Sequence, residues 1–337
     1  MATATGPATT TEPLAAMAEA ARWAPSVHNT QPWRFEVWRA GPAPGEAVGL
    51  MIFEDADRSL PVLDPYGRLR AISCGAAVAN AEVACRAKGF SPVVDWLPDA
   101  SRPDLVAVVR PDRPHQEQTD VRRLADAVMT RRTHRRVHRH ERLDPDTLAS
   151  LRHEVTTAGA EMTVLDEAAR RHLAILLVQA MSVQSGSPEI VDEVDSWVRG
   201  VGPGEQERED GVPVASLGTG PFPIDSLAHE VMDVERLSSE DVDQALSWST
   251  TVAISTVGDR RRDWLNAGRA LQRMWLHATV DGFVLAFADQ ATQLADTRRR
   301  LPEALDILGH VQLVVRLGRP LVDVPPTPRR PIAEVLT

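Results

Sequence analysis

An internal repeat constrains this 337-residue chain more than any other feature of its sequence. Residues 74–90 can be laid over residues 267–283 at one offset, with Gly, Ala, Gly and Phe identical. In the same order along the chain, Val108–Pro114 matches Val314–Pro320. Because similar segments that recur in order indicate a duplicated architecture, we expect two copies of one unit. Chance similarity between two Ala-rich helices is the alternative reading.

Hydrophobic spacing gives the expected elements of each copy. The first copy should contain a helix, a two-stranded hairpin, a small-residue helix and a buried strand, over residues 14–23, 35–38 with 48–53, 72–88 and 105–110. A weaker match lays Leu14–Met17 over Leu148–Leu151, inside the helix expected at 147–155. The Ala and Gly of 72–88 would let another helix approach closely, which places that helix at the centre. The predicted class is α+β, with two tandem pseudo-symmetric copies, each a mainly antiparallel sheet flanked by helices.

Each copy carries one feature that the other lacks. The first copy has the loop Pro25–Trp33 after its first helix, whereas the matching helix of the second copy leads almost directly to a strand at Glu161–Leu165. Conversely, the second copy is preceded by the arginine-rich arm Arg131–Arg136, and nothing similar precedes the first helix. These reciprocal losses predict that two symmetric sites have become one composite site. We place the halves at residues 1–125 and 126–337.

The loop suits a flat heterocycle with donors and acceptors at its rim. Ser26, Asn29 and Gln31 lie between two prolines, and Trp33 should anchor them in a core. The alternative is a helix-to-strand turn whose polar side chains only cap backbone groups.

The arm suits a phosphate group. Residues 131–142 hold six arginines and three histidines, and Arg side chains beside the hydroxyl of Thr133 form a clamp for an anion. A second cationic pair, Arg329 and Arg330, lies near the end of the sequence. A solvated basic linker is the alternative. His134 and His138 would share a helical face, but the flanking arginines oppose a metal cation, so no metal site is expected.

Charge and composition exclude other classes. The formal net charge of −10 argues against a general nucleic-acid-binding protein. No apolar run reaches the ~20 residues of a membrane-spanning helix, and the first residues lack the pattern of a secretory signal. We therefore expect a cytoplasmic protein without nucleic-acid or membrane partners. Cys74 and Cys85, eleven residues apart on one helix, should be two buried thiols rather than a disulfide.

At these residues the chain resembles the nitroreductase superfamily, and within it the fused, twin-domain, Acg-like branch. The loop Pro25–Trp33 is similar to the family's PSxxNxQPW motif, and Arg131–Arg135 is similar to its RRSxR arm, with Thr133 in place of serine. The resemblance covers nearly the whole chain. In ordinary members two identical subunits share each FMN, so that the arm of one holds the phosphate and the loop of the other touches the isoalloxazine ring. A fused chain would imitate that homodimer as a monomer.

The resemblance implies a cofactor site and a role for each residue. FMN would be bound by residues of the loop, of the arm and of the C-terminal pair: Pro25, Ser26, Val27, His28, Asn29, Gln31, Arg131, Arg132, Thr133, Arg135, Arg329 and Arg330. The phosphate would lie at Arg131, Thr133 and Arg135, while Ser26, His28 and Asn29 would meet the flavin. No side chain is assigned as catalytic, since flavin N5 would carry the chemistry.

The implied activity is an FMN-dependent NAD(P)H oxidoreductase that passes a hydride through flavin N5 to a nitroaromatic, a quinone or another small acceptor. Two departures from the family leave points open. The stretch Phe287–Gln293 replaces a Glu-Gly element that approaches N5 in other members, and residues 182–250 form an insertion that could be a lid. A lid that closes over the flavin would instead favour a protein that sequesters FMN with little turnover. A nucleic-acid-associated protein that uses the arm is a third class, opposed by the overall charge.

Overall fold

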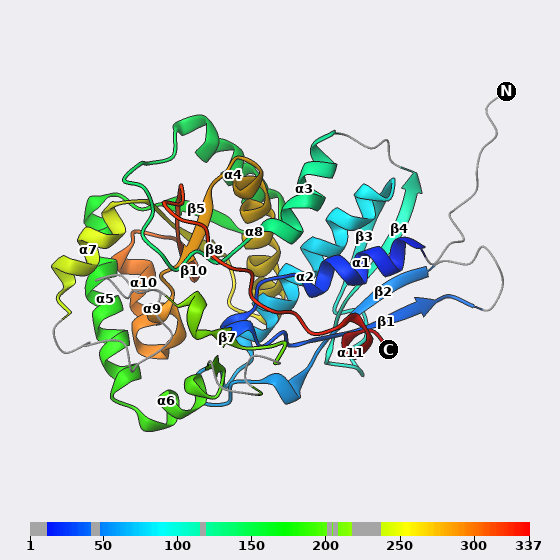
Figure 1. Cartoon of the computed structure of the whole chain (residues 1–337), viewed down its shortest axis with the longest axis horizontal. Helices are drawn as coiled ribbons and strands as arrows, with labels where there is room; N and C mark the ends of the chain where they lie inside the picture. Colours follow the sequence, from blue (N-terminus) through cyan, green and yellow to red (C-terminus); the bar gives the residue numbers. More distant parts are fainter. Residues whose placement is uncertain (1–11, 42–47, 115–118, 201–203, 205–207, 218–236) are drawn as a thin grey trace.

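A computed structural model describes residues 12–41, 48–114, 119–200, 204, 208–217 and 237–337. It contains two four-stranded antiparallel sheets (Figure 1). The first has the order β1-β2-β4-β3 and the second the order β5-β8-β10-β9. In chain order their bounds are β1 (Trp33–Arg39), β2 (Val48–Glu54), β3 (Phe90–Trp96), β4 (Leu105–Pro114), β5 (Glu161–Val164), β8 (Thr250–Thr256), β9 (Val284–Phe287) and β10 (His310–Gly318).

The two sheets also agree in register. Val109 of β4 faces Leu50 on one side and Val94 on the other. The equivalent Val315 of β10 faces Val252 and Phe287. The repeat expected from the sequence therefore recurs as the same strand order and the same residue pairing, and the predicted α+β class is confirmed.

Two long helices lie side by side between the sheets, α2 (Arg68–Ala87) and α8 (Arg261–Val280) (Figure 1). The offset that aligns Gly75 with Gly268, 193 residues (268 − 75), also aligns the first and last residues of these helices. The small-residue helix thus lies at the centre as predicted, and it begins at Arg68 rather than at Ile72. The helix begins earlier than predicted because Arg68 and Leu69 are both buried, and this burial stabilises an additional first turn.

The remaining helices cover the sheets. α1 (Glu12–Arg22) packs on α2, and its counterpart α4 (Pro145–Thr157) packs on α8. Asp144 begins α4 by accepting a hydrogen bond from Thr147 N, with proline at the first helical position. α3 (Thr119–Thr130) contacts both central helices. The arm that follows α3, residues 131–140, is not helical, so the predicted helical face shared by His134 and His138 is wrong.

The second half carries two insertions relative to the first. Between β5 and β8 the structure describes six elements: α5 (Glu167–Ser185), α6 (Pro188–Asp195), the short strands β6 (Val198–Arg199) and β7 (Val212–Pro213), the 3-10 helix η3 (Val214–Ser216) and α7 (Ser239–Ser247). Between β9 and β10 it places α9 (Gln290–Gln293) and α10 (Ala295–Ala304). The expected lid, 182–250, falls partly outside the described residues.

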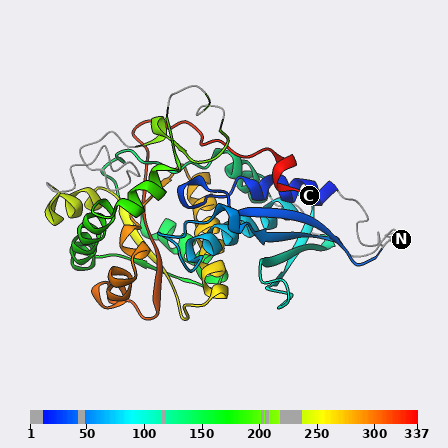
Figure 2. The ribbon, with the colours of Figure 1, turned by 90° about the horizontal axis from the view of Figure 1, so that it is seen from below.

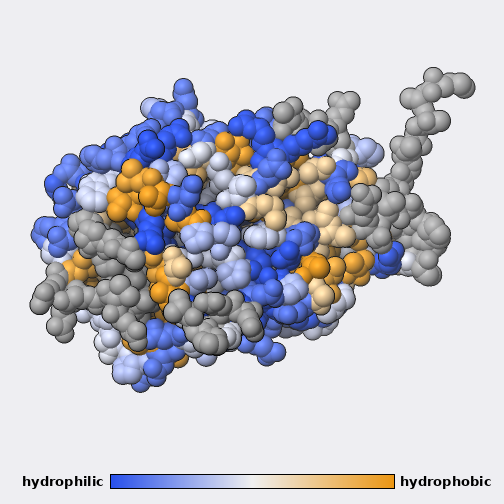
Figure 3. Space-filling view, viewed as in Figure 1, coloured by the Kyte–Doolittle hydropathy of each residue, from blue (hydrophilic) through white to orange (hydrophobic). Residues whose placement is uncertain are grey.

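Apolar residues form one core in each half and another beneath the insertion. Trp33 and Phe35 are fully buried in the first core, and Trp275 of α8 in the second. The third packs α5, α7 and α10 against the second sheet. Hydrophilic residues cover much of the face seen in Figure 3, with apolar side chains gathered in limited areas.

The C-terminal segment crosses back to the first half and lies beside α1 (Figure 2). After α11 (Ile332–Val335), Leu336 forms a parallel bridge with Phe35, and Thr337 N donates a hydrogen bond to Phe35 O at 3.0 Å. The end of the second half therefore completes the edge of the first sheet.

Candidate functional site

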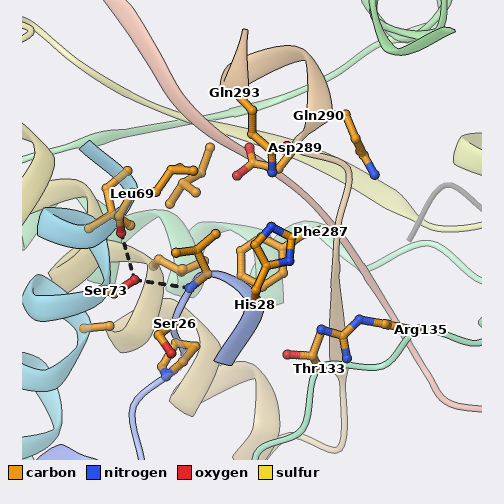
Figure 4. A pocket seen from close by; sticks show the side chains of 16 residues that line it. Ser26, His28, Leu69, Ser73, Thr133, Arg135, Phe287, Asp289, Gln290 and Gln293 are labelled. Atoms are coloured by element: carbon orange, nitrogen blue, oxygen red, sulfur yellow. Dashed lines mark hydrogen bonds between the residues drawn. The ribbon is translucent and has the colours of Figure 1, made fainter. Parts of the chain in front are cut away.

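A pocket of about 800 Å³, counting the space open to solvent, lies where the two halves meet (Figure 4). Both features singled out in the sequence reach it, the loop through four residues and the arm through two. The lining consists of Pro25, Ser26, Val27, His28, Leu69, Ile72, Ser73, Ala76, Thr133, Arg135, Leu271, Phe287, Asp289, Gln290, Gln293 and Leu313.

Helix α2 contributes one wall that the sequence analysis did not assign. Leu69, Ile72, Ser73 and Ala76 follow the spacing i, i+3, i+4, i+7 and therefore share one helical face. That spacing was a usable signal, but an Ala-rich helix with apolar residues on every side does not reveal which face borders a cavity. The opposite wall comes from Phe287 at the end of β9 and from α9.

The loop has an unusual backbone. His28, Asn29 and Gln31 have φ of 46°, 55° and 51°, in the left-handed region that non-glycine residues seldom adopt. Ser26 Oγ accepts a hydrogen bond from Gln31 N at 2.9 Å, and Val27 N donates to Ser73 Oγ at 3.3 Å. Such a conformation persists only where neighbouring contacts enforce it.

Asn29 and Gln31 make many of the contacts that hold the loop in this conformation. Neither residue lines the pocket. Asn29 Nδ2 donates to Gly211 O at 2.8 Å, and its Oδ1 accepts from Arg329 Nη1 at 2.9 Å. Gln31 donates to Glu209 O at 2.8 Å and accepts from Arg330 N at 2.9 Å. These two predicted cofactor residues therefore tie the loop to the insertion and to the C-terminal segment.

Most of the predicted cations are also engaged by protein groups. Arg131 is buried, lies 4.3 Å from the centre of the Trp275 ring and donates to Trp23 O at 3.0 Å. Arg329 donates to Ala24 O at 3.2 Å and to Thr327 Oγ1 at 2.8 Å. Arg132 donates to the carbonyls of Met129 and Arg131, and Arg330 lies near Asp55 and Glu334.

Burial dominates the electrostatics of this arginine group. Desolvation lowers the pKa of Arg131 well below its ordinary value, and the nearby Arg329 and Arg132 lower it further. Desolvation followed by repulsion from Arg132 and Arg22 lowers the pKa of Arg329 to about 9. Two buried guanidiniums, whose pKa values are lowered by burial and by neighbouring arginines, form an environment that a bound anion would stabilise.

Asp289 is the acidic side chain of the lining. Its Oδ1 accepts hydrogen bonds from Val314 N at 3.0 Å and from Thr292 Oγ1 at 2.8 Å. Burial raises the pKa of Asp289, against the opposing influence of Arg68. The sequence pattern indicated the stretch that contains Asp289 but no role for this residue.

The internal repeat relates the pocket to a second position in the molecule. There the side chains that correspond to two residues of the pocket wall contact each other. The 193-residue offset pairs Leu69 with Arg262 and Asp289 with Trp96, and the Arg262 guanidinium lies 4.1 Å from the centre of the Trp96 ring. One large side chain from each half thus occupies the place that is pseudo-symmetric to the pocket wall.

Within the ranges that the structure describes, no three His, Cys, Asp or Glu side chains gather as a metal site, although the His134 and His138 rings are 5.2 Å apart. None of the described helices combines the length and the apolar composition needed to cross a bilayer.

Comparison with known proteins gives relatives over nearly the full chain. The Mycobacterium tuberculosis protein named "Putative NAD(P)H nitroreductase acg" is 29% identical over 341 residues, covering 97% of this chain and 96% of its own. "Putative NAD(P)H nitroreductase Rv3131" of the same organism is 28% identical, with 93% and 88% covered. "Uncharacterized protein Rv3127" is 27% identical, with 93% and 89% covered.

No family model matches the chain. The structure of a "putative nitroreductase" from Anabaena variabilis aligns with a TM-score of 0.48 at 13% identity, covering 88% of this chain and 82% of that one. An FMN-bound nitroreductase structure from Bacteroides fragilis aligns with a TM-score of 0.37 at 13% identity, covering 60% and 93%. Over nearly its full length the chain is therefore homologous to the mycobacterial acg protein, a relative named as a putative NAD(P)H nitroreductase.

Proposed function

We propose that this protein is an FMN-dependent NAD(P)H oxidoreductase that reduces a nitroaromatic, a quinone or another small acceptor. In this proposal residues 1–125 and 126–337 are the two halves of a fused pair, and one chain does the work of the family homodimer. Because the fused pair completes its own pocket, we propose a monomer.

The observation that carries the proposal is that the loop and the arm share one pocket. His28 and Thr133 are 105 residues apart in sequence (133 − 28), and they come from different halves, yet both line the same cavity. A hydrogen-bonding loop at one end of a cavity and a cation at the other suit a flat ring that carries a phosphate tail.

The lining fits FMN in its chemistry. Val27, Leu271, Phe287 and Leu313 offer apolar surface to a ring, and Ser26, Ser73 and His28 offer polar groups at its rim. Pro25 frames the same edge. When bound, FMN would supply hydride acceptance and donation at N5. The chain would contribute binding, orientation and a cationic setting that stabilises negative charge on the reduced cofactor.

We assign the remaining predicted cofactor residues to three groups. Thr133 and Arg135 would bind the phosphate directly, because both line the pocket. Arg131, Arg132, Arg329 and Arg330 would add positive charge behind them. Asn29 and Gln31 would act as positioning residues through their contacts with Gly211 O and Glu209 O.

The insertion bears on the alternative, an FMN-sequestering protein. The described part of residues 182–250 contributes no residue to the pocket lining. Its segment 209–211 instead supports the loop from the side away from the pocket. We therefore give the described part of the insertion a supporting role, and cofactor reduction decides between turnover and storage.

Purified protein distinguishes these functions. The proposal expects bound FMN that NADH or NADPH bleaches under anaerobic conditions and that an added quinone or nitroaromatic reoxidises. Stable colour without bleaching would favour sequestration, and failure to take up added FMN would remove both functions.

The phosphate assignment has a matched pair of variants. Arg135→Ala should weaken FMN binding by at least about tenfold, since a charge-assisted hydrogen bond to an anion contributes ~1.5–3 kcal/mol. Arg139→Ala removes the same charge from the same arm, but Arg139 is exposed and donates to Pro320 O outside the pocket. Equal FMN affinity in the two variants would contradict the assignment.

A further inference from the structure

The pocket contains a buried acid, Asp289, that has no role in the proposed binding of the cofactor. Asp289 lies where β9 leads into α9, and only 6% of its surface is exposed. Figure 4 shows its side chain with those of Gln290 and Gln293 along one wall, across the pocket from Ser26 and Thr133.

Both nearby cations are committed to other partners. Arg68 of α2 donates to Gln312 O and to Thr292 O, each at 2.7 Å. Arg298 of α10 forms an ion pair with Asp259. Within the described residues, no ion pair at 4.0 Å or less involves the Asp289 carboxylate. The carboxyl is therefore held in place by neutral donors, Val314 N and Thr292 Oγ1, which both bind Oδ1.

This environment favours the neutral acid. Removal from water disfavours a charged carboxylate unless an opposite charge compensates. Burial raises the pKa of Asp289 even though Arg68, Arg298 and the two hydrogen bonds act in the opposite direction. Since Oδ1 already accepts two hydrogen bonds, Oδ2 is the oxygen left to carry a proton.

We propose that Asp289 is the proton donor for the acceptor substrate, so that the pocket is built for acceptors whose reduction consumes a proton together with a hydride. This inference rests on the proposed function. Reduction of a quinone to a hydroquinone takes up one hydride and one proton. The hydride comes from the reduced cofactor, and the Asp289 O–H bond breaks to give the proton to the quinone oxygen. The carboxylate that remains recovers a proton from solvent.

The same step balances for a nitroaromatic. One hydride and one proton convert the nitro group into a nitroso group and water. The acid transfers its proton to the departing oxygen, which leaves as water. An acceptor that takes single electrons and no proton, such as ferricyanide, would not need Asp289.

An infrared measurement tests the protonation state without a bound cofactor. The wild-type chain at neutral pH should show the carbonyl stretch of a protonated carboxylic acid, shifted in heavy water, and Asp289→Asn should lose that band. Asp259→Asn is the matched control, because burial is outweighed there by hydrogen bonds from Arg298, Trp264 and Gln312, which lower the pKa of the Asp259 carboxyl. A band that is equal in wild type and Asp289→Asn would overturn the inference.

A kinetic ratio tests the proton transfer itself. Asparagine keeps an oxygen for Val314 N and Thr292 Oγ1, so Asp289→Asn should fold. The ratio of reoxidation rates with a quinone and with ferricyanide should fall by about 10²-fold, the usual contribution of a positioned acid. Asp289→Glu should restore part of that ratio. An equal loss with both acceptors would show a structural role and overturn the inference.

The two proposals fail in different ways. If the chain binds no FMN, the proposed function fails, while the infrared band still decides whether Asp289 holds a proton. If FMN binds and is reduced but the ratio does not change in Asp289→Asn, the function stands and the proton donor is wrong.

Discussion

Gly75 and Gly268 lie at equivalent positions where α2 and α8 cross, each against the backbone of the other helix. A Cβ atom on Gly75 would lie 2.1 Å from Leu265 O, and one on Gly268 would lie 1.8 Å from Ile72 O. No side chain fits at either distance. The repeat detected in the sequence therefore includes the contact that holds the halves together.

Replacing either glycine should separate the helices. Gly268→Ala forces backbone rather than a flexible side chain to move, so we expect the free energy of unfolding to fall by about 3 kcal/mol or more. Denaturant titration followed by circular dichroism measures the loss. Gly186→Ala is the control, since Gly186 has φ of −84° and lies at a helix end, and it should cost under about 1 kcal/mol. Similar losses in the two variants would contradict the close-contact explanation.

The chain should bind one FMN rather than two. The pseudo-symmetric position brings Arg262 and Trp96 into contact, and their side chains leave no equivalent pocket wall. Titration of protein without flavin, followed by fluorescence quenching, should saturate at one FMN per chain. Saturation at two would show that the second site persists.

Asn29 should stabilise the loop through its bonds as well as through its backbone. Asn29→Gly keeps the left-handed conformation but loses the contacts with Gly211 O and Arg329, which should cost about 2 kcal/mol. Asn29→Ala should cost ~1 kcal/mol more, because alanine disfavours a φ of 55°. Thermal unfolding of the two variants separates the contributions. Equal stability of Ala and Gly variants would argue against backbone strain.

Mild acid should destabilise the protein through His138. This ring is buried, and desolvation, aided by Arg316 and His134, lowers its pKa from 6.5 to about 3. Below pH 6.5, His138 therefore binds a proton in the unfolded chain but not in the folded chain. The free energy of unfolding falls as the pH decreases. Between pH 6.5 and 5 the free energy of unfolding should drop by about 2 kcal/mol. His138→Phe should flatten this dependence, and an unchanged slope would identify another group.

Both cysteines should resist modification in the folded protein. Cys74 and Cys85 are fully buried free thiols, as the sequence predicted, and burial raises the pKa of Cys85 to about 12. A thiol that is neither exposed nor ionised reacts slowly. Ellman's reagent should detect no thiol in the native state and two after denaturation. Rapid native reaction would mean that the crossing of α2 opens readily.

The parts of the fold that follow periodic patterns were predictable. The offset of Gly75 to Gly268 located both central helices, and the match of Val109 to Val315 located equivalent positions in the two sheets. The regular spacing of apolar residues identified these elements because each helix or strand buries one of its faces along its length. The insertion between β5 and β8 has no counterpart in the first copy, so the repeat could not describe it.

The site was less predictable. Pattern indicated the loop and the arm, but it could not show which side chains face inward. Asn29 and Arg131 look as suitable as their neighbours in sequence, yet carbonyl oxygens of Gly211 and Trp23 hold them elsewhere. Asp289 was undetectable for the opposite reason, since its importance comes from burial and from two donors that only the fold supplies.

The bond from Asn29 to Pro328 O joins residues separated by 299 positions. During synthesis the ribosome therefore delivers the loop long before the segment that shapes it. A nascent chain therefore lacks this support for its left-handed turn until residue 328 has been synthesised.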